Sequence, residues 1–159
     1  MTASEVALRW GEWVANMGEW HVFGGLTYDP KRYVHKFDDF QARGDVERWL
    51  GDSKAHPGTW IEAAVVALEH HKNGWPHFHP LIRVRGGLRG HELQELGQAW
   101  FGRHGYAKLE VPRDAGAVCN YAAKYLSKDL DRGDVVLWPP RGDLRSHQPS
   151  YMATRVGRT

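Results

Sequence analysis

The most constraining feature of this sequence is a hairpin signal within residues 60–84. Its first half is apolar at odd and even positions alike, which is typical of a strand buried on both faces. Asn73-Gly74 follows as a strong turn signal, and the second half alternates as a half-buried strand. Because successive side chains of a strand point to opposite faces, His77 and His79 project together, away from Phe78.

Two neighbouring imidazoles are a ready pair of metal ligands. The chain has ten histidines in 159 residues, so a His-apolar-His triplet arises easily by chance and needs supporting features. A hard divalent ion also requires an oxygen ligand. The preceding strand offers Glu69, and its reach depends on how the two strands pair.

Two pairings of the hairpin are compatible with the turn. A loop of residues 73–75 places Glu69 opposite His79 and His71 opposite His77, whereas a loop of residues 73–74 places His70 opposite His77. A proline cannot donate a ladder hydrogen bond beside a tight turn, so Pro76 favours the longer loop. We therefore predict Glu69 as the third ligand, with the two histidines that follow it as alternatives.

A helix predicted at residues 115–130 carries a second chemical pattern. Tyr121, Lys124, Tyr125 and Lys128 follow a spacing that puts them on one helix face, apart from the apolar stripe. The tyrosines either cover the edge of the core or act as nucleophiles near phosphate. A phenol is a poor nucleophile at neutral pH, because its pKa is about 10. A nearby cation favours the phenolate, and a metal makes the phosphate a better electrophile. The two patterns together predict phosphoryl transfer from nucleic acid to tyrosine.

The rest of the chain predicts an α+β fold with a central antiparallel sheet of about five strands. Further helices are expected at residues 1–18, 34–50 and 88–101, and further strands at 20–28, 105–111 and 135–138. Ser4 is expected to cap the first helix and Asp114 the last. We predict one domain over residues 1–132, followed by an irregular tail rich in Arg and Pro at 133–159.

Composition narrows the class of protein. The single cysteine, Cys119, excludes an internal disulfide and fits a reducing compartment. No run of about 18 apolar residues and no secretory signal is visible, so we expect a cytoplasmic protein without a membrane partner. A net charge of +2 is compatible with nucleic acid. Most of the eight tryptophans are expected in the core, with one or two as alternatives for stacking on bases. The predicted phosphate contacts are the cations Lys31, Arg32 and Lys36, together with Arg83.

At this point the sequence resembles a known family. The segment EHHKNGWPHFHPLI (residues 69–82) resembles the metal motif of the HUH endonucleases. YAAKYLSKD (121–129) resembles their nucleophile motif in its two-tyrosine form, and GGLTYDP (24–30) resembles their first motif. The order is the same, and the resemblance spans about residues 20–130. The two-tyrosine form belongs to replication initiators of small single-stranded DNA phages and of related rolling-circle plasmids.

The resemblance implies a fold with the tyrosine helix packed over the two histidines. It implies nicking of single-stranded DNA at an origin or hairpin, with a 5′-phosphotyrosine and a free 3′-OH as products. His77, His79 and Glu69 would hold Mg²⁺ or Mn²⁺, the two lysines of the helix would position phosphate, and Thr27 would contact DNA. Either tyrosine could attack, and Tyr121-x-x-Lys124 is the closer copy of the one-tyrosine pattern, which favours Tyr121.

The resemblance also bears on partners and rivals. No Walker A pattern is present, so a helicase and a polymerase of a bacterial or archaeal host are expected partners. A transposase or relaxase with the same chemistry is the main alternative. A binding module without catalysis and a zinc hydrolase that uses Glu69, His71, His77 and His79 are further rivals.

Overall fold

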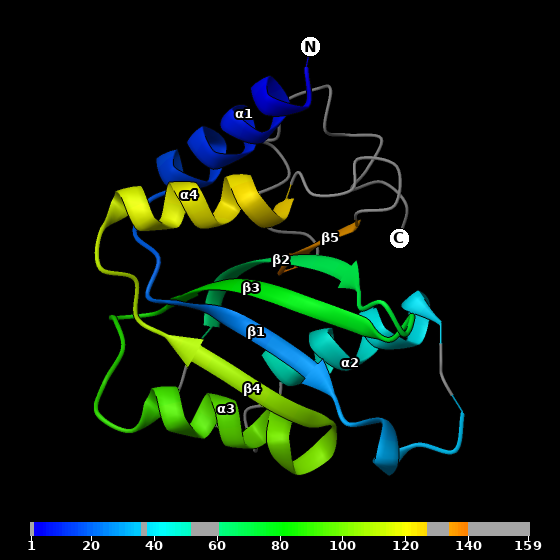
Figure 1. The fold of residues 1–159 in the computed structure, drawn as a ribbon. Coiled ribbons are helices and arrows are strands. Elements are labelled where there is room, and N and C mark those ends of the chain that lie inside the picture. Colours follow the sequence, from blue (N-terminus) through cyan, green and yellow to red (C-terminus); the bar gives the residue numbers. More distant parts are fainter. Residues whose placement is uncertain (1, 36–37, 52–60, 127–133, 140–159) are drawn as a thin grey trace.

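The computed structural model describes residues 2–35, 38–51, 61–126 and 134–139. Within them the chain forms one open antiparallel sheet with helices on both faces, so the predicted α+β fold is confirmed (Figure 1). The strand order is β4-β1-β3-β2-β5. The strands are β1 (Val22–Tyr28), β2 (Ile61–His70), β3 (Pro76–Val84), β4 (Gly105–Glu110) and β5 (Asp134–Trp138). The helices are α1 (Ala3–Asn16), α2 (Asp39–Gly51), α3 (Glu92–Arg103) and α4 (Ala115–Leu126), with a 3₁₀ turn, η1, at Pro30–Arg32.

The period of two in the strands divides the core into two layers. Odd-numbered residues of β2, such as Val65, pack under α1 and α4. Even-numbered residues, such as Val66, pack against α2 and α3 on the opposite face. The sheet is therefore buried on both sides, as the apolar run of β2 predicts. In Figure 1, α1 and α4 lie side by side above the sheet and α3 lies below it.

Helix α1 begins with a capping box rather than at the predicted cap. The side-chain oxygen of Thr2 accepts a hydrogen bond from the Glu5 backbone N–H at 3.2 Å, and the Thr2 N–H donates to the Glu5 carboxylate at 2.6 Å. The prediction of Ser4 as the cap is wrong, because Thr2 lies three residues before a glutamate and closes this reciprocal pair. Ser4 lies within the helix.

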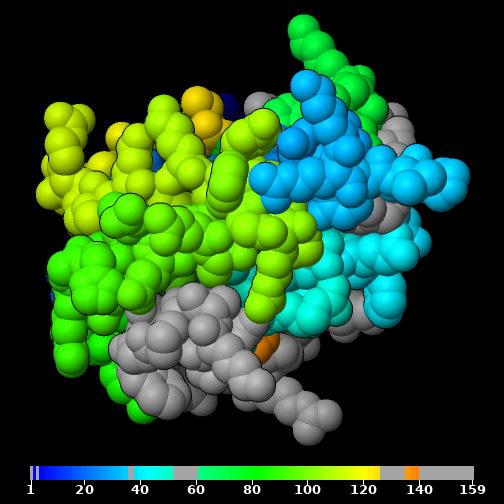
Figure 2. All heavy atoms as spheres, turned by 90° about the horizontal axis from the view of Figure 1, so that it is seen from below, coloured from blue at the N-terminus to red at the C-terminus, as the bar shows by residue number. Residues whose placement is uncertain are grey.

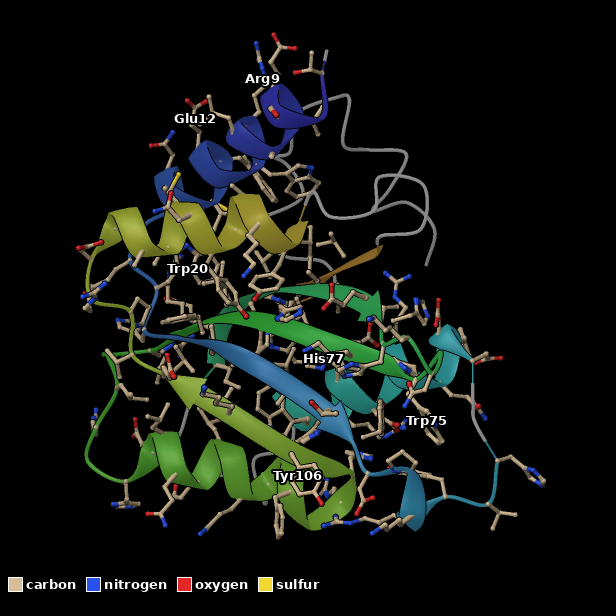
Figure 3. The ribbon with its side chains drawn as sticks, viewed as in Figure 1. Arg9, Glu12, Trp20, Trp75, His77 and Tyr106 are labelled. Atoms are coloured by element: carbon tan, nitrogen blue, oxygen red, sulfur yellow. The ribbon has the colours of Figure 1, made fainter. Side chains whose placement is uncertain are left out.

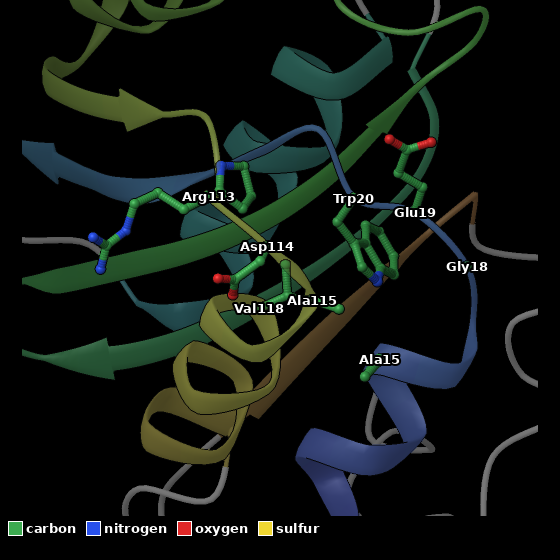
Figure 4. Close-up of a pocket in the computed structure, with 9 residues that line it drawn as sticks. Ala15, Gly18, Glu19, Trp20, Arg113, Asp114, Ala115 and Val118 are labelled. Carbon is green, nitrogen blue, oxygen red and sulfur yellow. The ribbon is translucent and has the colours of Figure 1, made fainter.

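Helix α4 is held tightly between α1 and the sheet. A Cβ atom on Gly11 of α1 would lie 2.8 Å from the backbone oxygen of Cys119, so only glycine allows this approach. Asp114 caps α4 as predicted, accepting from the Ala117 N–H at 2.8 Å. A small cavity of about 180 Å³ separates this helix start from Trp20 and the end of α1 (Figure 4).

The glycine pair of β1 marks a close approach of strands. The pairing of β1 with β4 is uniform from Phe23–Glu110 to Tyr28–Gly105, so there is no bulge. A Cβ on Gly24 would lie 1.9 Å from the Lys108 carbonyl oxygen, which explains a glycine there.

The strand predicted after the last helix is confirmed as β5, which pairs with β2. Residues 140–159 of the predicted tail lie outside the described residues, apart from the strand end at 139. None of the helices in the described part of the chain has the length and apolarity needed to cross a lipid bilayer.

Candidate metal centre and tyrosine helix

The hairpin that carries the histidines closes with a longer loop than predicted. Glu69 pairs with His77 and the next residue of β2 pairs with Pro76, so the connection comprises residues 71–75. Asn73 holds this loop, because its side-chain oxygen accepts from the Trp75 N–H at 3.0 Å. The predicted register is therefore wrong by two residues. A shift of two preserves the face of every side chain, and Glu69 still lies on the face of both histidines.

The side chains of Glu69, His77 and His79 converge on one point. One ligand atom from each lies within 4.8 Å of the others. His79 Nε2 lies 2.9 Å from Glu69 Oε1, and the two imidazole centroids are 4.5 Å apart. A divalent ion binds nitrogen and oxygen ligands at about 2.1 Å, so small side-chain adjustments bring all three donors onto one ion. Two imidazoles and one carboxylate fit a divalent cation.

The two alternative histidines differ in position. His70 lies on the opposite face of β2, and its Nε2 lies 2.7 Å from the Asp39 carboxylate of α2. The ring centroid of His71 lies 4.5 Å from that of His77, but His71 stands outside the converging donor set of the described residues. The geometry therefore supports Glu69 as the third ligand.

Thr27 holds the ring of His77 from the neighbouring strand. Its hydroxyl oxygen lies 3.1 Å from His77 Nδ1, which leaves Nε2 as the nitrogen available to an ion. Thr27 pairs with His77 on one side and with Tyr106 on the other. Together with Glu69 these residues form a row across β2, β3, β1 and β4, on the face beneath α4.

The two tyrosines of α4 face this row but have different surroundings. The ring of Tyr125 stacks on His79, with centroids 3.6 Å apart and an interplanar angle of 18°. The Tyr121 hydroxyl donates a hydrogen bond to the Gly24 carbonyl oxygen, and its ring contacts Phe23. Burial raises the pKa of Tyr121 above its ordinary value. The ring centroids of the two tyrosines are 4.7 Å apart, so both belong to one site.

A groove of about 400 Å³ joins these groups. It is lined by the glycines and Thr27 of β1, both histidines of β3, part of β4, and both tyrosines. The Lys124 ammonium lies 5.0 Å from the centroid of the Tyr125 ring. Lys128, predicted on the same helix face, lies outside the described residues.

The predicted DNA contacts occupy three different places. Thr27 lies in the groove, whereas Lys31 and Arg32 lie on η1. Arg83 shares the histidine face, but its guanidinium donates to the carbonyls of Met17 and Glu19 and lies over Trp20. It fastens the α1–β1 connection to the sheet. Lys36 lies outside the described residues.

Sequence reasoning missed the contribution of β4 to the groove. Tyr106 and Lys108 point to the site face, because they pair with Thr27 and Gly25. The period of two within residues 105–110 would have found this face, once β4 is known to pair with β1.

The fold and the site define a class of α+β protein: a sheet with a candidate divalent-metal centre beneath a helix that bears two tyrosines. The sequence model of the family described as replication-associated protein ORF2 matches residues 21–130. The chain belongs to this family of rolling-circle replication initiators, whose members are generally nickases. Membership implies binding to DNA at an origin. No curated protein and no solved structure gives a significant match.

Proposed function

We propose that this chain nicks and rejoins single-stranded DNA at a replication origin through a tyrosine-linked intermediate, with Mn²⁺ or Mg²⁺ as cofactor. The observation that carries the proposal is the convergence of three metal-ligand side chains and two phenols in one groove. The family match supports replication initiation over transposition or conjugation, which use the same chemistry.

Glu69, His77 and His79 would hold the ion. A divalent ion in this position would polarise the scissile phosphate and offset the negative charge that builds up on it. The remaining work falls to side chains of the groove. Thr27 fixes the orientation of one ligand ring, and Glu69 contacts the other. The ligands are thereby positioned before DNA binds.

The reaction exchanges one phosphoester for another. The phenol loses its proton, its oxygen bonds to phosphorus, and the bond from phosphorus to the 3′ oxygen breaks. That oxygen takes up a proton and leaves as a free 3′-OH, while the 5′ end stays on the tyrosine. Attack of a 3′-OH on the phosphotyrosine reverses these changes and rejoins the strand. In a cytoplasmic setting, the free 3′-OH would serve a host polymerase, with a host helicase separating the strands.

The geometry favours Tyr125 as the first nucleophile, the reverse of the preference drawn from the sequence. Its ring stacks directly on His79, a proposed ligand, and the Lys124 ammonium lies 5.0 Å from the centroid of the same ring. A nearby ammonium favours the phenolate. Tyr121 must first release the Gly24 carbonyl, and its burial opposes ionisation. Tyr121 would then act in the second transfer.

The test is formation of a covalent adduct with an origin-type DNA hairpin in the presence of Mn²⁺. Protein and labelled oligonucleotide are incubated and separated on a denaturing gel, and the modified peptide is mapped by mass spectrometry. We expect an adduct on Tyr125, a loss of it in Tyr125→Phe, and none in the double variant with Tyr121→Phe. Tyr33→Phe, on the other side of the sheet, is the matched control and keeps the adduct.

The metal arm of the same assay uses the histidines. Replacing both His77 and His79 with alanine should abolish the adduct, as should excess chelator, while His70→Ala on the opposite face should not. An adduct that persists in chelator would contradict the metal proposal. An adduct on a residue other than the two tyrosines of α4 would contradict the nucleophile proposal.

A further inference from the structure

Two exposed aromatic rings stand next to each other at the open edge of the sheet. Strand β4 is an edge strand, and Tyr106 on it is 57% exposed. Phe101 near the end of α3 is 50% exposed, and the two ring centroids are 6.2 Å apart. Figure 3 shows Tyr106 between β4 and this end of α3. Exposed rings of this size do not contribute to the core, so their pairing calls for another explanation.

The pair lies on a surface that continues from the catalytic groove. A second groove, of about 400 Å³, runs between α3 and β4 and includes Leu93 and Phe101 on its helix side. Tyr106 and Ala107 line this groove and also line the groove of the histidines and tyrosines. A chain that leaves the catalytic groove over β4 therefore reaches Tyr106 first and Phe101 next.

The distance suits the nucleotides that neighbour the scissile phosphate. Tyr106 pairs with Thr27, which pairs with His77, so two strand spacings separate Tyr106 from the metal ligand. Each spacing is about 4.8 Å, which places Tyr106 about 10 Å from His77 across the sheet. Gly25 has no side chain to obstruct this path, since a Cβ there would meet the His77 ring at 3.4 Å.

Positive charge accompanies the rings. The Arg32 guanidinium lies 5.0 Å from the centroid of the Phe101 ring, and its Nε lies 3.7 Å from the Asp29 carboxylate. Lys108 extends from the edge of β4, with its ammonium 4.0 Å from the Glu110 carboxylate. In Figure 2 the green and yellow-green surface of α3 and β4 adjoins the blue surface of the chain around η1. Cations beside exposed rings match a partner with a charged backbone and flat bases.

We propose that Tyr106 and Phe101 form a stacking platform for bases of the single-stranded DNA next to the scissile phosphate. The inference rests on the proposed function and adds the path of the substrate. The rings stack on bases of any sequence, because every base has a flat aromatic face. Arg32 and Lys108 contact the backbone phosphates, and the Glu69–Tyr106 row links the platform to the metal centre.

Binding is measured without catalysis, so that it is separate from the nicking proposal. The probe is a fluorescein-labelled oligothymidylate, followed by anisotropy in excess chelator. We expect the dissociation constant to rise at least about fivefold in Tyr106→Ala and in Phe101→Ala. Tyr106→Phe keeps the ring and should stay within about twofold of the parent protein. Phe40→Ala is the matched control, because this ring on α2 is 81% exposed and lies away from both grooves.

Salt dependence separates stacking from charge. Tyr106→Ala should weaken binding without changing the slope of log affinity against log salt. Lys108→Ala should reduce that slope by about 0.7, the value of one contact between a cation and a single-strand phosphate. Glu110→Gln removes the carboxylate beside this lysine and should strengthen binding.

Dissociation constants that match the parent protein in both Tyr106→Ala and Phe101→Ala would overturn the platform. Self-association that Phe101→Ala abolishes, with DNA binding unchanged, would also overturn it and assign the surface to a second copy of the chain. The nicking proposal is judged separately, by whether the parent protein forms the tyrosine adduct with Mn²⁺. A failed platform and a failed nicking proposal therefore give different results.

Discussion

Replacing Thr27 with valine tests whether the site is built to orient a metal ligand. Valine keeps the volume and the β-branched shape of threonine, so the strand is unchanged and only the hydroxyl is lost. That hydroxyl lies 3.1 Å from His77 Nδ1. In the variant, this ring nitrogen faces a methyl group, and the ring loses the contact that fixes its rotation and tautomer.

The magnitude follows from the burial of the pair. Leaving a buried polar atom without its partner costs about 1–3 kcal/mol, and Thr27 and His77 are both half-buried, so we expect the lower part of this range. A cost of about 1.4 kcal/mol corresponds to a tenfold change in affinity. This agrees with the lower end of the roughly 10–100-fold losses that are typical when the partner of a metal ligand is removed.

The assay is Mn²⁺ binding by isothermal titration calorimetry at neutral pH, without DNA. Thr27→Val should raise the dissociation constant about tenfold, whereas Thr27→Ser, which keeps the hydroxyl, should stay near the parent value. Equal Mn²⁺ affinity in the valine variant and the parent would refute the reasoning, because His77 would then not depend on its neighbour. Circular dichroism of both variants checks that the fold is unchanged.

Three further predictions concern the ligand set, the helix layer and the buried phenols. Glu69→Ala should weaken Mn²⁺ binding in the same assay, while Glu62→Ala on the same strand should not; the reverse result would reject Glu69 as a ligand. Gly11→Ala should lower the free energy of unfolding in guanidinium by about 1–3 kcal/mol, because its Cβ would clash with the Cys119 backbone, whereas Gly102→Ala, with open space around it, should not lower it. Burial, and then the Asp45 carboxylate, raise the pKa of Tyr28, so its neutral form stabilises the fold below pH 10 and this contribution is lost as pH rises above about 10. Tyr28→Phe should therefore make the fall in stability above pH 10 shallower by up to about 1.4 kcal/mol per pH unit, and an unchanged slope would contradict this assignment.

The sequence was sufficient for the features that depend on periodicity. The face shared by His77 and His79 follows from the alternation of β3, and α1 and α4 bury the apolar parts of the opposing layer as their spacing indicates. The placement of Glu69 also survived, although the register was wrong, because the error was an even number of residues. Face is encoded by local pattern, and each side chain along the strand supports the same answer.

Features that depend on contacts between distant segments were not accessible in this way. The hairpin register is set by the hydrogen bonds of the 71–75 loop, which a turn dipeptide alone does not specify. Thr27 and His77 are fifty residues apart, and only the strand order brings them together. Arg83 was placed on the correct face, but its partners come from the α1–β1 connection, whose path over the sheet no periodic pattern reveals.

The order of the strands has a consequence for the life of the newly made chain. The row beneath α4 draws on β1, β2, β3 and β4, so the site depends on pairings between segments that are distant in the sequence. Because a ribosome releases the chain from its N-terminus, the ligands of the proposed metal centre emerge before the tyrosines, which come later on α4. An unfinished chain would therefore hold a metal-binding sheet without a nucleophile. By the mechanism proposed above, cutting activity begins only once α4 has docked between α1 and the sheet.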